Sequence, residues 1–284
     1  MWTEVYTKNH YYIRKRAIMN WDESIAWLKR QPEYKELIYY CYYDDPIDDA
    51  LIRFRNSTEW KATTPYLPSP GTALDIGAGN GIASCAFAEL GWRVFSLEPN
   101  IGSIAGLKSF MPVAKRKKYP IFPICGYAEQ LPFGDSYFDL VYMRQVMHHA
   151  QDLSQFCAEV FRVLKPGGTV IAVRDHVITK HDDLILFKES HPLAGICGEE
   201  HAYLCNDYLY ALKSAGFQVS NVLNPKESDI NLYPSNCNEY KRKIREKIHL
   251  PDIFPIPNIC LKIMGSLDNT PGRLYSFVGH KKNS

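Results

Sequence analysis

The segment LDIGAGNGIASCAFAELGWRVFSLEPN, residues 74–100, places three glycines at alternate positions directly after a short apolar run. Glycine has no Cβ, so such a turn lets backbone N–H groups and the N-terminus of the following helix approach a ligand closely. Glu98 follows Gly77 by 21 residues, where a carboxylate at the end of a second strand can accept hydroxyl groups of a ribose. The spacing therefore predicts a strand–turn–helix–strand unit that binds an adenosine-type ligand.

Two details of this segment separate the possible ligands. A dinucleotide turn has the pattern G-x-G-x-x-G, which would place its third glycine at position 82, and this chain has Ile82 there. Asp75 precedes the first glycine by two residues, where a carboxylate would repel a pyrophosphate but attract an ammonium group. No G-K-[ST] phosphate loop is present. A cationic ligand without phosphate suits these residues, and S-adenosylmethionine fits that description.

Short apolar runs alternate with amphipathic segments along the middle of the chain. Runs rich in β-branched and aromatic residues predict buried strands at 72–77, 93–98, 121–125, 138–143, 169–175, 217–223 and 274–281. Helical spacing of apolar residues predicts helices at 81–90, 101–110, 152–164, 206–216 and 238–248. The repeated order predicts an α/β fold with a doubly wound, mostly parallel, seven-stranded, Rossmann-like sheet.

The remaining segments predict additions to that sheet. Residues 1–70 are dense in Tyr and Trp and end in the proline-rich stretch TTPYLPSPG, which indicates an N-terminal helical extension that covers the site as a lid. These aromatics would form a wall for the acceptor or pack the added helices onto the sheet. Residues 71–284 form the core domain, with insertions on the substrate side at about 176–204, after the fifth strand, and at about 225–272.

Composition sets broad limits on the class of protein. A formal charge of +2 creates no overall field that would attract nucleic acid or an anionic membrane. Eight scattered cysteines contain no C-x-x-C pair, which favours reduced thiols over a disulfide framework or a zinc site, so we expect no metal. No apolar stretch is long enough to span a membrane, and we expect a cytoplasmic protein.

Several linked motifs resemble the class I S-adenosylmethionine-dependent methyltransferases, in particular their type 11 small-molecule group. The segments LDIGAGNG, LEPN, GYAEQLPFGDSYFDLVYMRQVMHH and FRVLKPGGTVIAV follow one another in the order and spacing of that family, over roughly residues 71–176. The resemblance implies that S-adenosylmethionine is the cofactor. It also implies the cofactor-binding residues, which are Asp75, Gly77, Ala78, Gly79, Glu98, Pro99, Tyr127, Ala128, Glu129, Arg144 and Gln145.

The resemblance also implies which part of the cofactor each of these residues contacts. The aspartate and glycines of the turn line the methionine end, Glu98 takes the ribose, and Pro99 lies beside the adenine. Tyr127 stands where the family has an Asp or Asn that bonds the adenine amino group, and is a departure from the pattern. Arg144 and Gln145 match positions that close over the methionine, although the family often has a small residue in place of this arginine.

Histidines near the predicted strand ends are the candidate catalytic residues. Methyl transfer to an oxygen or nitrogen with a high pKa needs a base, and histidine serves that purpose near neutral pH. His148 and His149 follow the fourth strand, and His176 closes the fifth, so these three are the candidate bases. The alternative is that they are structural. The insertion adds His191, Glu199, Glu200 and His201, which could contact a polar substrate or a divalent ion, although their spacing is not diagnostic of a metal site.

We therefore expect an S-adenosylmethionine-dependent methyltransferase that acts on an O or N atom of a small, polar, sugar-like metabolite. An RNA methyltransferase is a second hypothesis, because KRKK at 115–118 and KRKIREK at 241–247 are basic clusters. The N-P-P-[YF] motif of amino-methylating nucleic-acid enzymes is absent, and we do not expect a nucleic-acid partner. A non-catalytic cofactor-binding subunit of a methyltransferase complex is a third. Monomer and homodimer both remain open.

Overall fold

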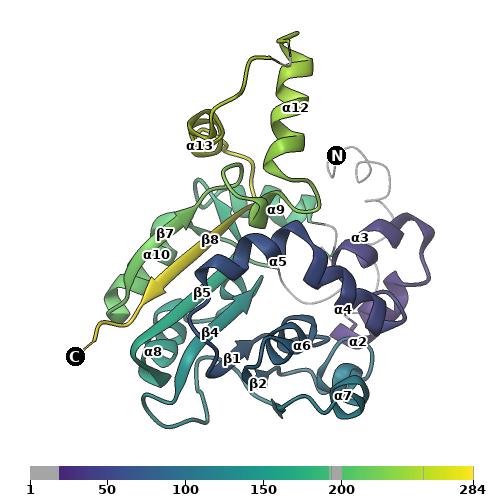
Figure 1. Cartoon of the computed structure of the whole chain (residues 1–284), viewed down its shortest axis with the longest axis vertical. Helices are drawn as coiled ribbons and strands as arrows, with labels where there is room; N and C mark the ends of the chain where they lie inside the picture. Colours follow the sequence, from purple (N-terminus) through teal and green to yellow (C-terminus); the bar gives the residue numbers. More distant parts are fainter. Residues whose placement is uncertain (1–18, 192, 194–199, 252, 284) are drawn as a thin grey trace.

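One mixed sheet runs through the centre of the molecule (Figure 1). The computed structural model describes residues 19–191, 193, 200–251 and 253–283. Strand order is β3-β2-β1-β4-β5-β8-β7, with parallel pairing from β3 to β5 and antiparallel pairing on both sides of β8. These strands are β1 (Thr72–Ile76), β2 (Arg93–Leu97), β3 (Ile121–Ile124), β4 (Phe138–Arg144), β5 (Leu164–Ile178), β7 (Gln218–Leu223) and β8 (Arg273–His280). The predicted doubly wound seven-stranded sheet is confirmed, and a two-residue strand β6 (Tyr203–Leu204) adds to the end of β5.

Both faces of the sheet are buried under helices. Along β4, Leu140 and Tyr142 point into one apolar core, and Val141 and Met143 point into the other. Burial on both faces explains why these strands read as continuous apolar runs. The first core is closed by α4 (Ile47–Asn56), α5 (Thr58–Thr63), α6 (Ile82–Glu89) and α7 (Leu107–Arg116), and the second by α8 (Leu153–Val163) and α10 (Cys205–Ala215).

The N-terminal helices form a small core of their own beside the glycine turn. They are α2 (Trp21–Leu28), η1 (Pro32–Tyr34) and α3 (Lys35–Tyr40). A short η2 (Thr64–Tyr66) connects α5 to β1. Asp22 attaches this layer to the sheet, because its carboxylate accepts hydrogen bonds from Asn100 Nδ2 and the Ala105 backbone at 2.9 and 3.0 Å. Residues 1–18 of the expected extension lie outside the described residues, and the role of a lid stays a prediction.

Two elements differ from the sequence-based expectation. The helix expected at 101–110 begins only at Leu107, because Asp22 and the Asn100 side chain hold the N–H groups of residues 102, 104 and 105 in a loop. Strand β5 continues to Ile178 instead of ending at Asp175, because β8 pairs with it across residues 175–177. Both causes are contacts between distant parts of the chain.

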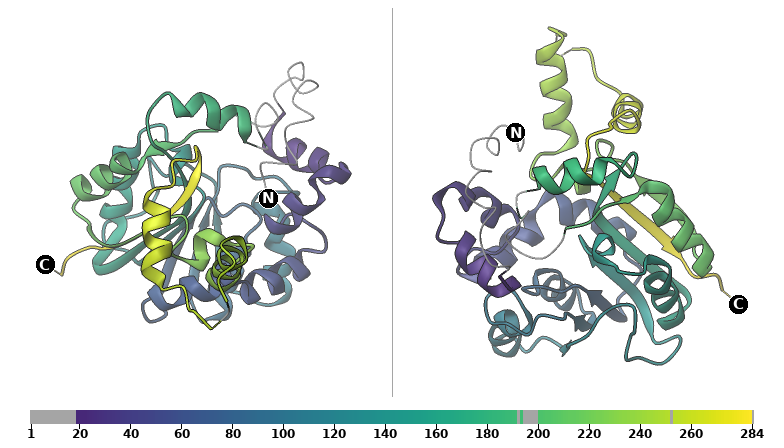
Figure 2. Two further views of the ribbon diagram at one scale, coloured as in Figure 1. Left: turned by 90° about the horizontal axis from the view of Figure 1, so that it is seen from above. Right: turned by 180° about the vertical axis from the view of Figure 1, so that it is seen from behind.

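The insertions carry the helix expected at 238–248 and further helices that the sequence did not predict. After β5, α9 (Asp183–Ser190) lies within the segment expected to be irregular. Between β7 and β8 lie α11 (Asp229–Leu232), α12 (Cys237–Lys247) and α13 (Asn258–Ser266), and the last two project away from the sheet (Figures 1 and 2). Among the described residues, none of the helices has the length and apolar character needed to cross a membrane.

A substitution at Gly81 tests how tightly the glycine turn packs against α7. The φ of Gly81 is +72°, and an added Cβ would overlap the ring of Phe110, so we expect Gly81→Ala to lower the free energy of unfolding by about 2–4 kcal/mol. Gly91→Ala is the matched control, because Gly91 has a φ of +89° but no atom within 4 Å of the added Cβ, and should lose only about 1 kcal/mol. Urea unfolding measures both, and equal losses would contradict the packing role of Gly81.

Candidate active site

A large cavity opens at the carboxyl edge of the parallel strands, where ligands bind in open α/β sheets. Its volume is about 1600 Å³. Ligand pockets for one small molecule are typically about 300–1,000 Å³, so this cavity can hold a cofactor and a second molecule together. The glycine turn, the ends of β2, β4 and β5, and residues of α2, α3 and α9 line it. Every residue predicted for cofactor binding or catalysis lies on its wall.

Glu98 ties the glycine turn to the end of β2. Its two carboxylate oxygens accept hydrogen bonds from the backbone N–H of Gly79 at 3.0 Å and of Asn100 at 2.9 Å. Burial raises the pKa of Glu98, and these two bonds lower it with a smaller effect. Each oxygen keeps a free lone pair, so the carboxylate can still accept hydroxyl groups of a ribose from the cavity.

Asp75 provides a second carboxylate on the cavity wall, at the carboxyl end of β1. It is buried, and the Ser84 hydroxyl donates a 2.6 Å hydrogen bond to it. Burial raises the pKa of Asp75 to about 7, and the charge of Glu98 acts in the same direction. A cation bound nearby would favour the ionised carboxylate, as expected for the ammonium and sulfonium of S-adenosylmethionine.

The predicted adenine side of the site is built mainly from backbone and small residues. Ala128 is buried on the wall, whereas 68% of Tyr127 is exposed at the rim of the cavity. The Glu129 carboxylate accepts a 2.9 Å hydrogen bond from the backbone of Gln151. Pro99 also lines the cavity. The exposed Tyr127 ring can cover a flat ring, but its side chain offers no carboxylate or amide to an adenine amino group. Tyr127 therefore does not replace the Asp or Asn contact of the family pattern.

Arg144 has a partner that the sequence did not reveal. Its guanidinium makes a bidentate pair with Glu59 of α5, with Nε–Oε1 at 2.6 Å and a second contact at 3.0 Å. Burial alone would lower the pKa of Arg144, but the charge and hydrogen bonds of Glu59 raise it above its ordinary value. A third bond, 3.0 Å long, goes to the Gln145 side chain. The Arg144 side chain is therefore held against α5. A contact between Arg144 and the methionine moiety stays a prediction.

The three candidate catalytic histidines meet at one end of the cavity. His148 Nδ1 lies 2.9 Å from Asp175 Oδ1, and His176 Nδ1 donates a 2.7 Å hydrogen bond to the Gly272 carbonyl. Asp175 reaches His148 because the β5–β8 register shifts just before it, at a bulge where Arg174 has a φ of +63°. Both histidines therefore leave Nε2 free.

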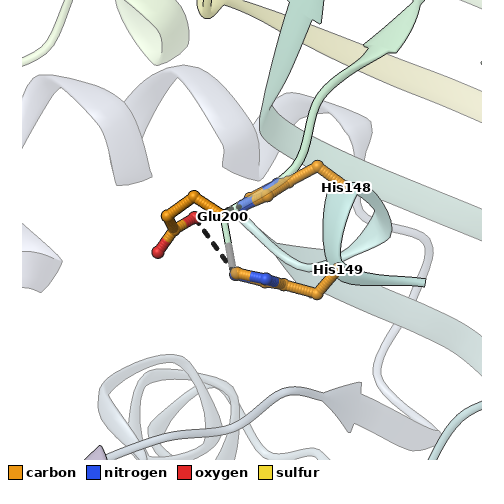
Figure 3. Close-up of side chains that lie close together, drawn as sticks. All are labelled: His148, His149 and Glu200. Carbon is orange, nitrogen blue, oxygen red and sulfur yellow. Dashed lines mark ion pairs between the residues drawn. The ribbon is translucent and has the colours of Figure 1, made fainter. Parts of the chain in front are cut away.

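Glu200 from the insertion stands among these imidazoles. Its carboxylate lies 3.9 Å from Nε2 of both His148 and His149 (Figure 3). It also lies 3.9 Å from Nδ1 of His191. Glu199, considered with it from the sequence, lies outside the described residues. We name the set His148, His149, His176, His191 and Glu200 the polar end of the cavity.

The surroundings of the polar end keep its imidazoles neutral near pH 7. Burial lowers the pKa of His149 and of His176 to about 4, and lowers the pKa of His191 well below its ordinary value. His149 remains accessible from the cavity, with 46% of its side chain exposed there. Burial also raises the pKa of Glu200 to about 7. Neutral imidazoles with a free nitrogen can accept a proton or bind a metal ion.

Sequence reasoning missed the side chains that close the cofactor end from the N-terminal layer. Tyr43 stands against Gly79, with its hydroxyl 3.1 Å from where a Cβ would lie, and Trp21 packs edge-on against Tyr43. Both line the cavity. Only their aromatic character was visible in the sequence, because the contacts join positions separated by dozens of residues.

The fold and the site together define a domain that binds an adenosine cofactor at the end of a doubly wound sheet. Residues 74–172 match the model of a family described as a methyltransferase domain. Residues 74–172 therefore form a methyltransferase domain of the type 11 family, and a relative from Mycolicibacterium smegmatis that is 33% identical over 107 residues is named as a probable S-adenosylmethionine-dependent methyltransferase. S-adenosylmethionine is accordingly the cofactor.

Curated relatives match over part of their length. A demethylmenaquinone methyltransferase of Renibacterium salmoninarum is 34% identical over 98 residues, which cover 34% of this chain and 38% of the relative. The mitochondrial ubiquinone biosynthesis O-methyltransferase of Rattus norvegicus is 35% identical over 132 residues, covering 44% of this chain and 37% of the relative. The chain thus spans little more than a third of the length of these two relatives.

Solved structures agree on the fold. The geranyl diphosphate C-methyltransferase of Streptomyces coelicolor, solved with Mg²⁺, geranyl diphosphate and S-adenosyl-L-homocysteine, superposes with a TM-score of 0.59 at 13% identity. The superposition covers 91% of this chain and 97% of that one. At this identity the likeness concerns the fold alone, including the additions around the sheet.

The raised pKa of Asp75 predicts that cofactor binding depends on pH. Below about pH 7 the free protein holds a proton on Asp75, and a cationic ligand must displace it, so affinity should fall by up to about tenfold per pH unit. Above about pH 8 the carboxylate is already ionised and this dependence should vanish. Calorimetric titration with S-adenosylmethionine, in two buffers with different heats of ionisation, measures the affinity and the released proton.

Asp75→Asn is the control for this prediction, because it keeps the shape and removes the titration. It should bind more weakly than the wild type above pH 7 and show no proton release that depends on this site. The cofactor's own amino group titrates equally in both proteins and cancels in the comparison. Identical pH profiles for the two proteins would rule out Asp75 as the group that responds to the cation.

Proposed function

We propose that this chain transfers a methyl group from S-adenosylmethionine to an oxygen or nitrogen of a small molecule held in the cavity. The observation that carries the proposal is that one cavity joins two chemically distinct ends. Asp75, the glycine turn and Glu98 form an end that suits a cationic adenosine cofactor. The polar end supplies imidazole nitrogens and a carboxylate where the acceptor would present its reactive group.

The reaction requires that the acceptor atom is aligned with the methyl group of the cofactor and that the acceptor loses one proton. The lone pair of the acceptor forms a bond to the methyl carbon while the bond between that carbon and sulfur breaks. The electron pair of the broken bond stays on sulfur, and the product is neutral S-adenosylhomocysteine. The acceptor loses its proton to a base. All three predicted bases line the cavity, but the His148 side chain is only 2% exposed and that of His149 is 46% exposed, so His149 is the better candidate of this pair. His176, held through Nδ1 with Nε2 free, is the alternative.

The walls of the cavity favour an acceptor with an apolar body and a polar head. Ile25, Leu28 and Leu37 of the N-terminal helices line the side contributed by that layer. Two relatives carry names from menaquinone and ubiquinone biosynthesis, which supports a hydroxylated ring with an apolar part. A sugar-like acceptor, as expected from the sequence, would need polar groups along its whole length, and the side formed by Ile25, Leu28 and Leu37 offers it none.

The arrangement of the basic segments gives the RNA hypothesis little support. Arg116 pairs with Asp48, and Lys117 pairs with Glu89, so part of the first cluster is neutralised. The second cluster lies on α12, at the opposite end of the molecule from α7 (Figures 1 and 2). Two separated clusters do not form a continuous track for a phosphate backbone.

Glu98→Ala tests the proposed use of the cofactor end. Losing hydrogen bonds to a charged group costs about 1.5–3 kcal/mol, so we expect the affinity for S-adenosylmethionine to fall by about 10–100-fold. Glu33→Ala is the control, because Glu33 is an exposed carboxylate away from the cavity. Calorimetry gives the affinities, and release of S-adenosylhomocysteine in the presence of hydroxylated aromatic, quinol and sugar acceptors gives the activity.

Three outcomes of that experiment separate the hypotheses. Binding with turnover of a small acceptor, lost in Glu98→Ala, supports the proposal. Equal cofactor affinity in Glu98→Ala and the wild type would refute the assigned site. Tight cofactor binding with no turnover of any acceptor until a partner protein is added would favour the non-catalytic subunit instead.

A further inference from the structure

We propose that His148, His149 and Glu200 hold a first-row divalent metal ion at the polar end, and that Zn²⁺ is the ion their donor atoms favour. Two imidazoles and one carboxylate are a common ligand set for zinc, whereas Mg²⁺ and Ca²⁺ prefer oxygen atoms alone. The spacing of these residues along the chain is not diagnostic of a metal site, because the ligands come from two segments about fifty residues apart and form no C-x-x-C or H-x-x-x-H pattern.

The spacing of the three donors suits one bound ion. One ligand atom from each of the three residues lies within 4.8 Å of the others, and Glu200 Oε2 is 3.9 Å from Nε2 of each imidazole (Figure 3). Ligands of a tetrahedral zinc ion at about 2.1 Å stand about 3.4 Å from one another. Small side-chain rotations would therefore bring the donors to bonding distance.

His148 is already oriented as a metal ligand. Its Nδ1 faces Asp175 Oδ1 at 2.9 Å, which fixes the tautomer with the proton on Nδ1 and leaves the lone pair of Nε2 directed at Glu200. A carboxylate behind a ligating imidazole is the usual support of a metal-bound histidine. A purely structural role, in which His148 only bonds to Asp175, would explain the orientation of His148. It would not explain why the Glu200 carboxylate lies beside the same ring.

Glu200 is the residue whose position calls for a cation. It is 5% exposed, and no hydrogen bond reaches its carboxylate from any described residue. A buried carboxylate without hydrogen bonds is costly, and the ion-pair contacts that reach Glu200 from the described residues come from three imidazoles at 3.9 Å. A divalent ion between the carboxylate and the imidazoles would satisfy all of these groups.

Three protein ligands leave one coordination position for another molecule. His149 lies on the cavity wall, so that position opens toward the space proposed for the acceptor. The catalytic use of the ion rests on the proposed function: with the ion bound, His149 is a ligand and no longer a base, and the ion takes over that role. A coordinated acceptor hydroxyl would lose its proton to water more readily, and its oxygen would then take the methyl group from sulfur. Binding of the ion does not rest on it.

The test is a titration of the full, tag-free chain with Zn²⁺ after treatment with a chelator. We expect one ion per chain by calorimetry, and Co²⁺ should give the intense visible absorption of a tetrahedral site, which Zn²⁺ then abolishes. His149→Ala and Glu200→Gln should each weaken Zn²⁺ binding by at least about tenfold. His181→Ala, which removes an exposed histidine outside the cavity, should bind as the wild type does.

Binding of S-adenosylmethionine serves as the fold control in each variant, because Glu98 and the glycine turn lie at the other end of the cavity. If the wild type shows no saturable Zn²⁺ binding, or if His149→Ala and Glu200→Gln bind Zn²⁺ like the wild type while retaining the cofactor, the metal site is wrong. That result would leave the proposed methyl transfer intact. Conversely, normal Zn²⁺ binding without methyl transfer would contradict only the proposed function.

Discussion

The carboxylate of Glu98 accepts the backbone N–H of Gly79 with one oxygen and that of Asn100 with the other, and the rest of the site is arranged around these two bonds. The first bond fixes the glycine turn against the end of β2. The second fixes Asn100, whose side chain reaches Asp22 and so connects the N-terminal helices to the sheet. One acidic residue thus links the cofactor loop, the strand end and the helical layer that closes the cavity.

Those parts of the fold that depend on local sequence were predictable. The strand–turn–helix unit from β1 to α6 follows from apolar runs and from glycines at positive φ, and Gly81 is also required by its contact with Phe110. The extension of β5 beyond Asp175 could not be predicted, because it depends on pairing with β8 about a hundred residues later. The late start of α7 likewise depends on Asp22.

The two ends of the cavity also differ in how far their residues could be predicted from the sequence. The cofactor end follows family motifs whose positions are fixed relative to the strand ends, so its residues could be named from the sequence. At the polar end, His148 and His149 were visible as polar residues after a buried strand, but their approach to Glu200 depends on how the insertion folds back. Glu59 was not visible at all, because an acidic residue in a short helix usually faces solvent, whereas here it is fully buried against Arg144.

The central claim is that the cofactor's sulfur faces the polar end, so that the acceptor and the histidines meet beside it. A crystal structure with S-adenosylhomocysteine bound tests this most directly. We predict that both ribose hydroxyls donate to Glu98, that the amino group lies near Asp75, and that the sulfur opens toward His149 and Glu200. A ligand with its sulfur directed away from these residues, or with its ribose away from Glu98, would contradict the account.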